Sequence, residues 1–275
     1  MVLMKRLRWF LALAISPLTL AAGCAPATAG PSQPPTAAQT LAPPKMTSKA
    51  TLLTFDERNL SAAKLGVTKP GVVVESLVAG GAKTTYGAGA SGAGLVLPTH
   101  AQTKAGQRMI LVMRPVSSAD PLNPGSRSFD FGADIKLESR SGDNAGDNGD
   151  NVLQRGLYGD YSQFKLQVDK RVPSCTVKSG PTRLFVKSKV KLGNGWHRVG
   201  CSYRSGKLSL SVAGITGTTV AAAKVTTVAG TVKPLSFGLK TPVSVGGKFG
   251  ANGKIVISNP DQFNGVLDNI YLDVL

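Results

Sequence analysis

Short runs in which apolar and polar residues alternate are the feature that most restricts the fold of this chain. From Phe129 to Leu137 every second residue is apolar, and the same period of two recurs from Phe164 to Val168 and from Leu208 to Val212. Such a period places one face of a strand in a core and the other in water. No stretch keeps the helical period over three turns. Several strands separated by turn residues, without crossover helices, predict an all-β antiparallel two-sheet sandwich or barrel.

The N-terminus predicts export. A basic head at residues 5–8 precedes an apolar run from Trp9 to Leu20, and small residues follow. This is the layout of a signal peptide, and the run is shorter than the roughly 20 residues that span a bilayer. Leu20–Cys24 resembles a bacterial lipobox, in which Cys24 would carry a lipid that anchors the protein to a membrane. Ala27–Ala29 offers ordinary cleavage and free secretion instead. Either route ends outside the cell or at its surface.

The composition then divides the chain into three parts. We assign 1–24 to the signal peptide. Residues 25–49 are rich in Pro, Ala, Thr and Ser and contain no acidic residue, which predicts a flexible linker. Residues 50–275 hold the alternating runs and form the predicted sandwich domain.

The charge of the chain predicts an anionic partner. Its net charge is +17, from 32 Lys and Arg against 15 Asp and Glu. A positive surface of this size favours nucleic acid, anionic lipid or acidic glycan. Export argues against nucleic acid, which leaves a polysaccharide or another anionic polymer as the expected partner.

The cations are concentrated between Lys165 and Lys207, where eleven of them face Asp169 as the one acidic residue. If 186–192 is a strand, three lysines line one face of it, about 6.6 Å apart. We therefore predict an anion-binding site; the alternative is a basic surface that serves only solubility. The candidate residues are Lys187, Lys189, Lys191, Arg183, Arg198 and Arg204.

Cys175 and Cys201 are the two cysteines of the sandwich domain. Because an exported chain enters an oxidising compartment, we predict a disulfide between them. Two buried free thiols are the alternative.

Catalytic groups are scarce in this sequence. Asp130, Asp134 and Glu138 share one strand face, but neighbours lie about 13 Å apart by the rise per residue. Glycoside hydrolysis needs two carboxyls roughly 5–9.5 Å apart. We therefore interpret these acids as a solvated face and favour a protein that is not an enzyme.

An Asp- and Asn-rich segment at 143–151 supplies the only metal candidates. Oxygen ligands on a flexible loop suit calcium, and Asp143, Asp147 and Asp150 are the weak candidates here. The spacing does not fit an EF-hand loop, and Gly, Asn and Asp are also ordinary turn residues. We favour a structural loop and no cofactor.

Two segments resemble the laminin-G-like family. Gly195–Gly214 reads as its Trp-His strand, a tight turn and an alternating strand, and Phe263–Ile270 is similar to its closing strand. Phe129–Leu137 with Asn151–Gly156 is similar to its paired middle strands. The resemblance implies a concanavalin-A-like jelly roll with a ligand surface on a rim or concave face, and it places Trp196 in the core. The same fold hosts lectins, adhesion modules and glycan-active enzymes.

These observations predict an exported, non-catalytic module that binds a glycan or another anionic polymer. One alternative is a glycan lyase of the same fold, with a Tyr or His as base beside cations. Another is a structural module that contacts a protein. Tyr158, Tyr161 and Tyr203 are the candidates for stacking against a sugar ring.

Overall fold

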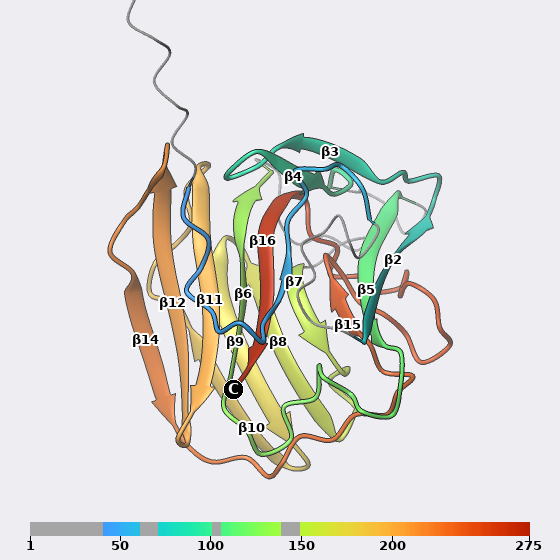
Figure 1. The fold of residues 1–275 in the computed structure, drawn as a ribbon, viewed down its shortest axis with the longest axis vertical. Coiled ribbons are helices and arrows are strands. Elements are labelled where there is room, and N and C mark those ends of the chain that lie inside the picture. The colour runs from blue at the N-terminus through green and yellow to red at the C-terminus, as the bar shows by residue number, and fades with distance from the viewer. Residues whose placement is uncertain (1–40, 61–70, 101–105, 139–148) are drawn as a thin grey trace, which may run out of the picture. The chain divides into compact units, whose positions relative to one another are not determined.

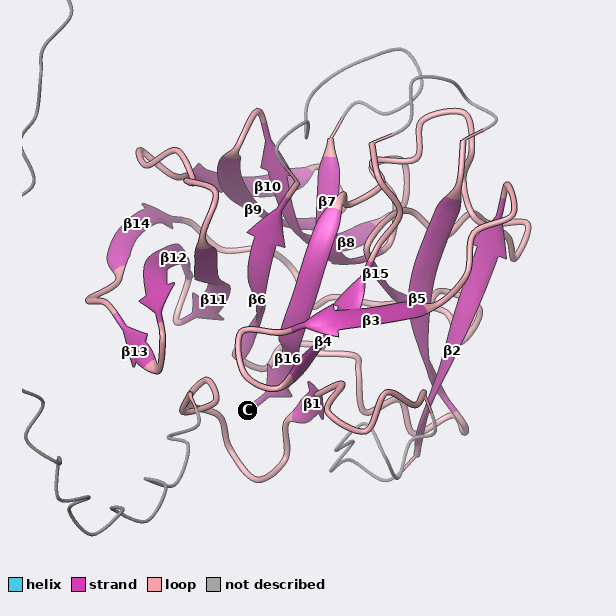
Figure 2. Ribbon diagram, turned by 90° about the horizontal axis from the view of Figure 1, so that it is seen from above, coloured by secondary structure: helices cyan, strands magenta, loops and turns pink. Residues whose placement is uncertain are grey.

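The computed structural model describes residues 41–60, 71–100, 106–138 and 149–275. The regular elements in these ranges are strands (Figure 2). Accordingly, the described part of the chain has no helix that is long and apolar enough to cross a membrane. The predicted signal peptide, Cys24, Asp143 and Asp147 lie outside the described residues.

The described strands form two antiparallel sheets (Figure 1). In the nine-stranded sheet the order is β13-β12-β11-β6-β16-β4-β3, with β1 on β16 and β14 on β12. Its strands are β1 (Thr51–Leu53), β3 (Thr85–Ala88), β4 (Ala93–Val96), β6 (Phe129–Leu137), β11 (Trp196–Arg204), β12 (Lys207–Thr216), β13 (Thr219–Val220), β14 (Lys224–Ala229) and β16 (Gly265–Val274).

In the seven-stranded sheet the order is β10-β9-β8-β7-β15-β5-β2. Its strands are β2 (Val72–Ala79), β5 (Arg108–Pro115), β7 (Asp150–Arg155), β8 (Ser162–Asp169), β9 (Val172–Ser179), β10 (Thr182–Lys187) and β15 (Val243–Val245). The two sheets pack face to face, which confirms the predicted antiparallel sandwich. The alternating runs in the sequence correspond to β6, β8 and β12.

Aromatic rings from both sheets fill the space between them. Phe129 and Phe131 of β6 lie with their ring centroids 5.4 Å and 5.2 Å from that of Phe164 on β8. All three side chains are buried. Fully burying a side chain of this size stabilises by roughly 1.5–3 kcal/mol, so these contacts are a main source of adhesion between the sheets.

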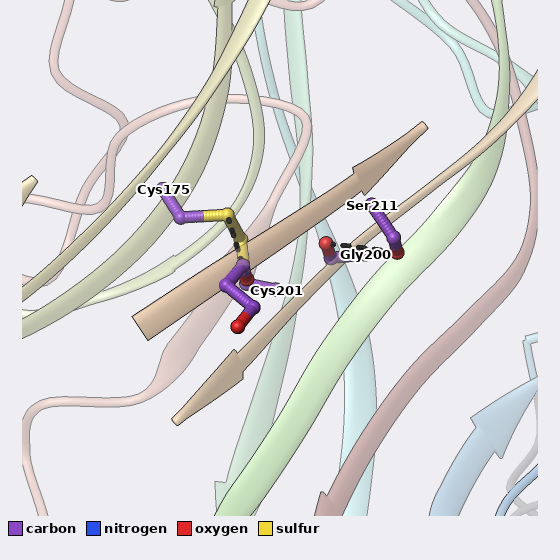
Figure 3. The surroundings of a disulfide bond; sticks show 5 residues. Cys175, Gly200, Cys201 and Ser211 are labelled. Carbon is purple, nitrogen blue, oxygen red and sulfur yellow. Dashed lines mark hydrogen bonds between the residues drawn. A yellow bond between two sulfur atoms is a disulfide. The ribbon is translucent and has the colours of Figure 1, made fainter. Parts of the chain in front are cut away.

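A disulfide links the sheets covalently beside this core. Cys175 on β9 and Cys201 on β11 are joined, with their Cα atoms 5.9 Å apart (Figure 3). The predicted pairing is confirmed, and the alternative of two free thiols is wrong. On the neighbouring strand, the Ser211 hydroxyl donates to the carbonyl of Gly200, as the dashed line in Figure 3 marks.

A two-residue turn fixes the register of β11 and β12. Ser205 and Gly206 both have positive φ values, 47° and 69°. This is the conformation of a type I′ hairpin turn, whose twist matches that of the strands it joins. Trp196 pairs with Ile215 at the other end of the hairpin.

The position of Trp196 corrects one prediction. Trp196 is only partly buried and lies outside the core clusters, because it has the strand parity of Arg198, whereas Val199 and Cys201 point inward. The period of two along β11 therefore decides its position, and the placement in the core that the family resemblance implied is wrong.

The last residues of the predicted linker contact the sandwich. The Thr47 backbone N–H donates to the Asp273 carboxylate over 2.7 Å, and Leu41 is buried. Arg198 donates to the carbonyl of Ala42. Residues 41–49 therefore lie against the nine-stranded sheet.

We predict that removing the disulfide lowers the free energy of unfolding by roughly 3–4 kcal/mol, because the bond closes a loop with a sequence separation of 26 residues. Denaturant titration of the double variant Cys175→Ser/Cys201→Ser against wild type measures this loss. Adding reductant should lower the free energy of unfolding of the wild type to that of the variant, and it should leave the value for the variant unchanged. Equal stability of the two proteins under oxidising conditions would contradict the prediction.

Candidate functional site

The outer face of the seven-stranded sheet, which points away from the other sheet, carries polar side chains. On β8, Phe164, Leu166 and Val168 are buried in the core, while Gln163 and Lys165 have the opposite parity. The same alternation on β7, β9 and β10 produces a continuous surface, which we call the polar face. It consists of Gln154, Gln163, Lys165, Gln167, Thr176 and Arg183.

Strand register arranges this surface in rows. Gln154 of β7 lies opposite Lys165, Lys165 lies opposite Thr176, and Thr176 lies opposite Phe185 of β10. Neighbouring strands are about 4.8 Å apart. This row therefore places an amide, an ammonium, a hydroxyl and an aromatic ring side by side across four strands.

A shared carboxylate holds two lysines at one side of the polar face. The Asp261 carboxylate lies 3.1 Å from the Lys165 ammonium and 2.9 Å from the Lys248 ammonium. Burial lowers the pKa of Lys165, Asp261 opposes that change, and the charge of Lys248 adds to it. The charge of Asp169 also acts on Lys165, so two carboxylates oppose the two ammonium groups, and the excess of positive charge at the cavity comes from Arg183.

A cavity of about 140 Å³ lies over the polar face, and Tyr158, Leu157 and Lys248 complete its lining. Tyr158 is 74% exposed. The Lys178 ammonium lies 5.4 Å from the centre of its ring and donates to the carbonyls of Tyr158 and Asp160. These contacts hold an exposed ring beside polar groups.

Arg183 lines the cavity, and its guanidinium lies over the ring of Phe185 on the same strand. The Arg183 guanidinium carbon lies 4.7 Å from the Phe185 ring centre, and one guanidinium N–H reaches the Thr176 hydroxyl at 3.4 Å. No carboxylate among the described residues forms an ion pair with Arg183, whose side chain is exposed.

Two buried polar atoms lie in the adjacent row. Among the described residues, the Oδ1 atom of Asn151 and the hydroxyl of Ser174 have no hydrogen-bond partner. Asn151 and Ser174 are both opposite Gln167 in the register, and Ser174 is opposite Lys187. Unpaired buried polar groups are costly, but both residues are buried and neither lines the cavity, so a ligand does not reach these atoms in this structure.

The structure separates the six predicted anion-binding residues. Arg183 and Lys187 share the outer face of β10. The strand ends at Lys187, so the expectation of a strand over 186–192 is wrong. Lys189 and Lys191 are exposed in the segment that follows. The Arg171 guanidinium donates to the carbonyl of Leu192, which binds the end of this segment to the turn before β9.

Arg198 and Arg204 lie on β11 in the other sheet, away from the polar face. Both guanidinium groups are held by carboxylates of β6: Arg198 by Asp134 at 2.8 Å, and Arg204 by Asp130. Counting charges within one sequence window missed these pairs, because their partners are more than sixty residues distant in the chain. The six residues therefore do not form one patch.

The acids of β6 are not a solvated face, which corrects another prediction. Asp134 is fully buried and accepts hydrogen bonds from Arg198 and from the Asn269 amide. Glu138 lies after β6 and accepts the backbone N–H of His100. These acids have structural partners, and none of them lines the cavities of the seven-stranded sheet.

Asp268 is a second buried acid on the nine-stranded sheet, directly opposite Asp134 in the register. Its carboxylate accepts the backbone N–H groups of Ser91 and Asn269. Burial raises its pKa to about 6, with the nearby charges of Asp134 and Asp56 acting in the same direction.

Among the calcium candidates, Asp150 is the one described. Its carboxylate is buried and accepts the backbone N–H of Asn264 at 2.9 Å, which ties β7 to the segment before β16. In the described ranges no three His, Cys, Asp or Glu side chains are grouped to hold a metal ion.

Two of the three candidate stacking residues are exposed. Tyr158 is 74% exposed and Tyr161 is 58% exposed. Tyr203 instead accepts the backbone N–H of Val232 with its hydroxyl and packs 6.0 Å from Phe129, so it belongs to the structural framework.

Sequence reasoning missed the amide groups of the polar face and the Lys248–Asp261 pair. The alternation along β8 contains the signal for Gln163 and Gln167, since both follow the polar parity of the strand. Lys248 and Asp261 come from a segment more than eighty residues further along the chain, and no local pattern places them beside Lys165.

Comparison with protein-family models and with curated protein sequences finds no match. Solved structures with a similar fold include a mutant of HCR D/C VPI 5995, at 10% identity and a TM-score of 0.50, covering 82% of this chain and 49% of that one. Another is the LG1-3 region of the laminin alpha2 chain, at 14% identity and a TM-score of 0.45. The match covers 59% of this chain and 30% of that one. A third is domain 4 of AbnA, a GH43 extracellular arabinanase from Geobacillus stearothermophilus, in complex with arabinotriose. It has 12% identity and a TM-score of 0.46, and the match covers 81% of this chain and 92% of that one.

The chain folds as a two-sheet antiparallel sandwich, the architecture that the laminin-G-like resemblance implied. At these identities the likeness concerns the fold alone. The chain spans about a third of the laminin structure and half of the HCR structure.

The raised pKa of Asp268 predicts a defined pH dependence of stability. Between pH 3.8, its ordinary pKa, and about 6 the folded protein holds a proton that the unfolded chain has released. The free energy of unfolding should therefore fall as the pH rises through this window, with this group contributing roughly 3 kcal/mol. In Asp268→Asn that contribution should vanish. The free energy of unfolding of the variant should therefore rise relative to that of wild type above pH 6. Urea titrations from pH 4 to 7 measure the difference.

The exposed carboxylate of Glu75 provides the control, and Glu75→Gln should follow the wild-type pH profile. If Asp268→Asn tracks the wild-type profile as well, the buried carboxylate does not hold the proton that we assign to it.

Proposed function

We propose that the protein is an exported, non-catalytic module that binds acidic glycan on the polar face of the seven-stranded sheet. The observation that carries this proposal is the cavity over β7–β10, where the cations Lys165, Lys248 and Arg183 lie among amide and hydroxyl side chains, beside the exposed ring of Tyr158.

The groups around the cavity match the chemistry of a sugar. Sugar hydroxyls both donate and accept hydrogen bonds, and so does an amide such as that of Gln167, which is partly exposed in the cavity lining. An aromatic ring supplies apolar contact to one face of a pyranose, and Tyr158 is available for that role.

The charge of the same surface favours an acidic sugar. Arg183 has no carboxylate partner among the described ion pairs, and a guanidinium binds a carboxylate or sulfate in a bidentate geometry. Lys187 continues the positive surface along β10, and Lys189 and Lys191 extend it beyond the strand. Several cations acting on one polymer raise affinity through multivalency.

On the polar face, the lyase alternative has Tyr158 as its candidate base; we assign that residue to stacking, because its exposed ring lies against the Lys178 ammonium. A tyrosine near arginines exists on the nine-stranded sheet, where Tyr271 lies close to Arg198. Burial raises the pKa of Tyr271 well above its usual value, whereas a catalytic base needs a lowered one. Arg198 there is already held by Asp134.

Export and anchoring form part of the proposal. Disulfides persist in oxidising environments, so the Cys175–Cys201 bond supports an extracellular location. We propose that the basic head and apolar run direct export and that Cys24 carries the lipid, which would place the binding module at the cell surface.

We predict that Arg183→Ala weakens binding to immobilised polygalacturonate at least tenfold, because a charge-assisted hydrogen bond contributes roughly 1.5–3 kcal/mol. The melting temperature should stay the same, since the side chain is exposed. Lys224→Ala removes one exposed cation from β14 in the other sheet and should bind like wild type. Equal effects of the two variants, or equal binding to uncharged dextran, would overturn the proposal.

We also predict that changing Lys187, Lys189 and Lys191 together to Ser preserves the fold and makes the dependence of binding on salt shallower. All three side chains are exposed, so their loss costs little stability. Polyanion binding releases counterions, and fewer cations release fewer of them. Binding measured between 50 and 300 mM NaCl gives the slope. A triple variant with the wild-type affinity and slope would exclude these lysines from the site.

A further inference from the structure

The cavity over the polar face continues into a second one. This second cavity has a volume of about 250 Å³, and the two share Gln154 and Leu157 in their linings. Each is smaller than the roughly 300–1,000 Å³ of a pocket that encloses a drug-sized ligand. Two adjoining shallow cavities suit a chain that lies along the surface better than they suit one enclosed small molecule.

The chemistry of the second cavity differs from that of the first. Its charged groups are Asp160 and Lys240, one of each sign, and the Asp160 carboxylate accepts the backbone N–H of Leu157. The remaining polar groups are mainly neutral, among them Ser236 and Ser244. This cavity therefore lacks the excess of positive charge that Arg183 gives the first one.

A ring is held at the edge of the second cavity. Tyr161 is 58% exposed and lines this cavity but not the first. Its ring lies over Gly180, where an added Cβ would come within 3.2 Å of it. The φ of Gly180 is +56°, so the turn after β9 needs glycine for its backbone and leaves room for the ring. Tyr161 therefore packs over Gly180 while most of its side chain stays exposed to a ligand.

We infer that the two cavities are adjoining subsites for one linear glycan, in which an acidic unit at the cationic cavity neighbours an uncharged unit at the cavity beside Tyr161. This inference rests on the proposed function and names the substrate class of the same site. Gln154 lies at the junction and is 2% exposed, with its side-chain oxygen bound to the Asn151 amide at 2.7 Å, so the junction is rigid. Arg183 then acts on the acidic unit, and Tyr161 acts on the uncharged one.

The test compares glucuronic acid with a hyaluronan tetrasaccharide, in which glucuronate alternates with N-acetylglucosamine. Binding is followed by NMR titration of the full folded domain. For wild type we expect the tetrasaccharide to bind at least tenfold more tightly than the monosaccharide. Tyr161→Ala should abolish that gain while its affinity for glucuronic acid stays at the wild-type level. Arg183→Ala should lower the affinity for both ligands.

A tetragalacturonate, in which every unit is acidic, provides the matched ligand and should show a smaller gain over its monosaccharide than hyaluronan does. Two outcomes would overturn the two-subsite inference and leave the proposed function intact. One is an equal gain in affinity for tetragalacturonate and hyaluronan over their monosaccharides. The other is a Tyr161→Ala variant whose affinity falls equally for glucuronic acid and the hyaluronan tetrasaccharide. Absence of binding to every acidic ligand, or an Arg183→Ala variant that binds like wild type, would overturn the proposed function itself.

Discussion

Apolar side chains from two sheets bury one another, and every other feature of the molecule depends on that contact. Phe131 of β6 and Phe164 of β8 meet with ring centroids 5.2 Å apart, and the Cys175–Cys201 bond locks the sheets together beside them. Since side chains alternate along a strand, fixing the inward set also fixes which residues face water. The polar face is thus a direct consequence of the core.

The two outer faces use their charges differently. On the nine-stranded sheet, Arg198 is paired with the fully buried Asp134, and residues 41–49 lie against that face. On the seven-stranded sheet, Lys165 and Lys248 share the carboxylate of Asp261, and Arg183 is exposed. The same residue type therefore has a structural role on one side and is available to a ligand on the other. This asymmetry is the main physical support for one binding face.

Rigidity is a further property of the proposed binding face. Its side chains project from strands whose register is fixed by hairpins, and Tyr158 and Tyr161 are held by contacts with Lys178 and Gly180. A surface that is ordered before binding loses less conformational entropy when a ligand arrives. For a flexible polymer such as a glycan, most of the ordering cost then falls on the ligand.

The sequence by itself determined the sandwich and the outward parity of Lys165 and Gln167, because strand alternation is a local property that needs only neighbouring residues. It determined the disulfide because the sandwich domain has two cysteines. Only the tertiary structure decided which cations remain available. Arg198 meets Asp134 across adjacent strands, and Lys165 meets Asp261 across 96 positions of the chain. Such pairs depend on how distant strands are aligned, and a count of charges along the sequence contains no information about that alignment.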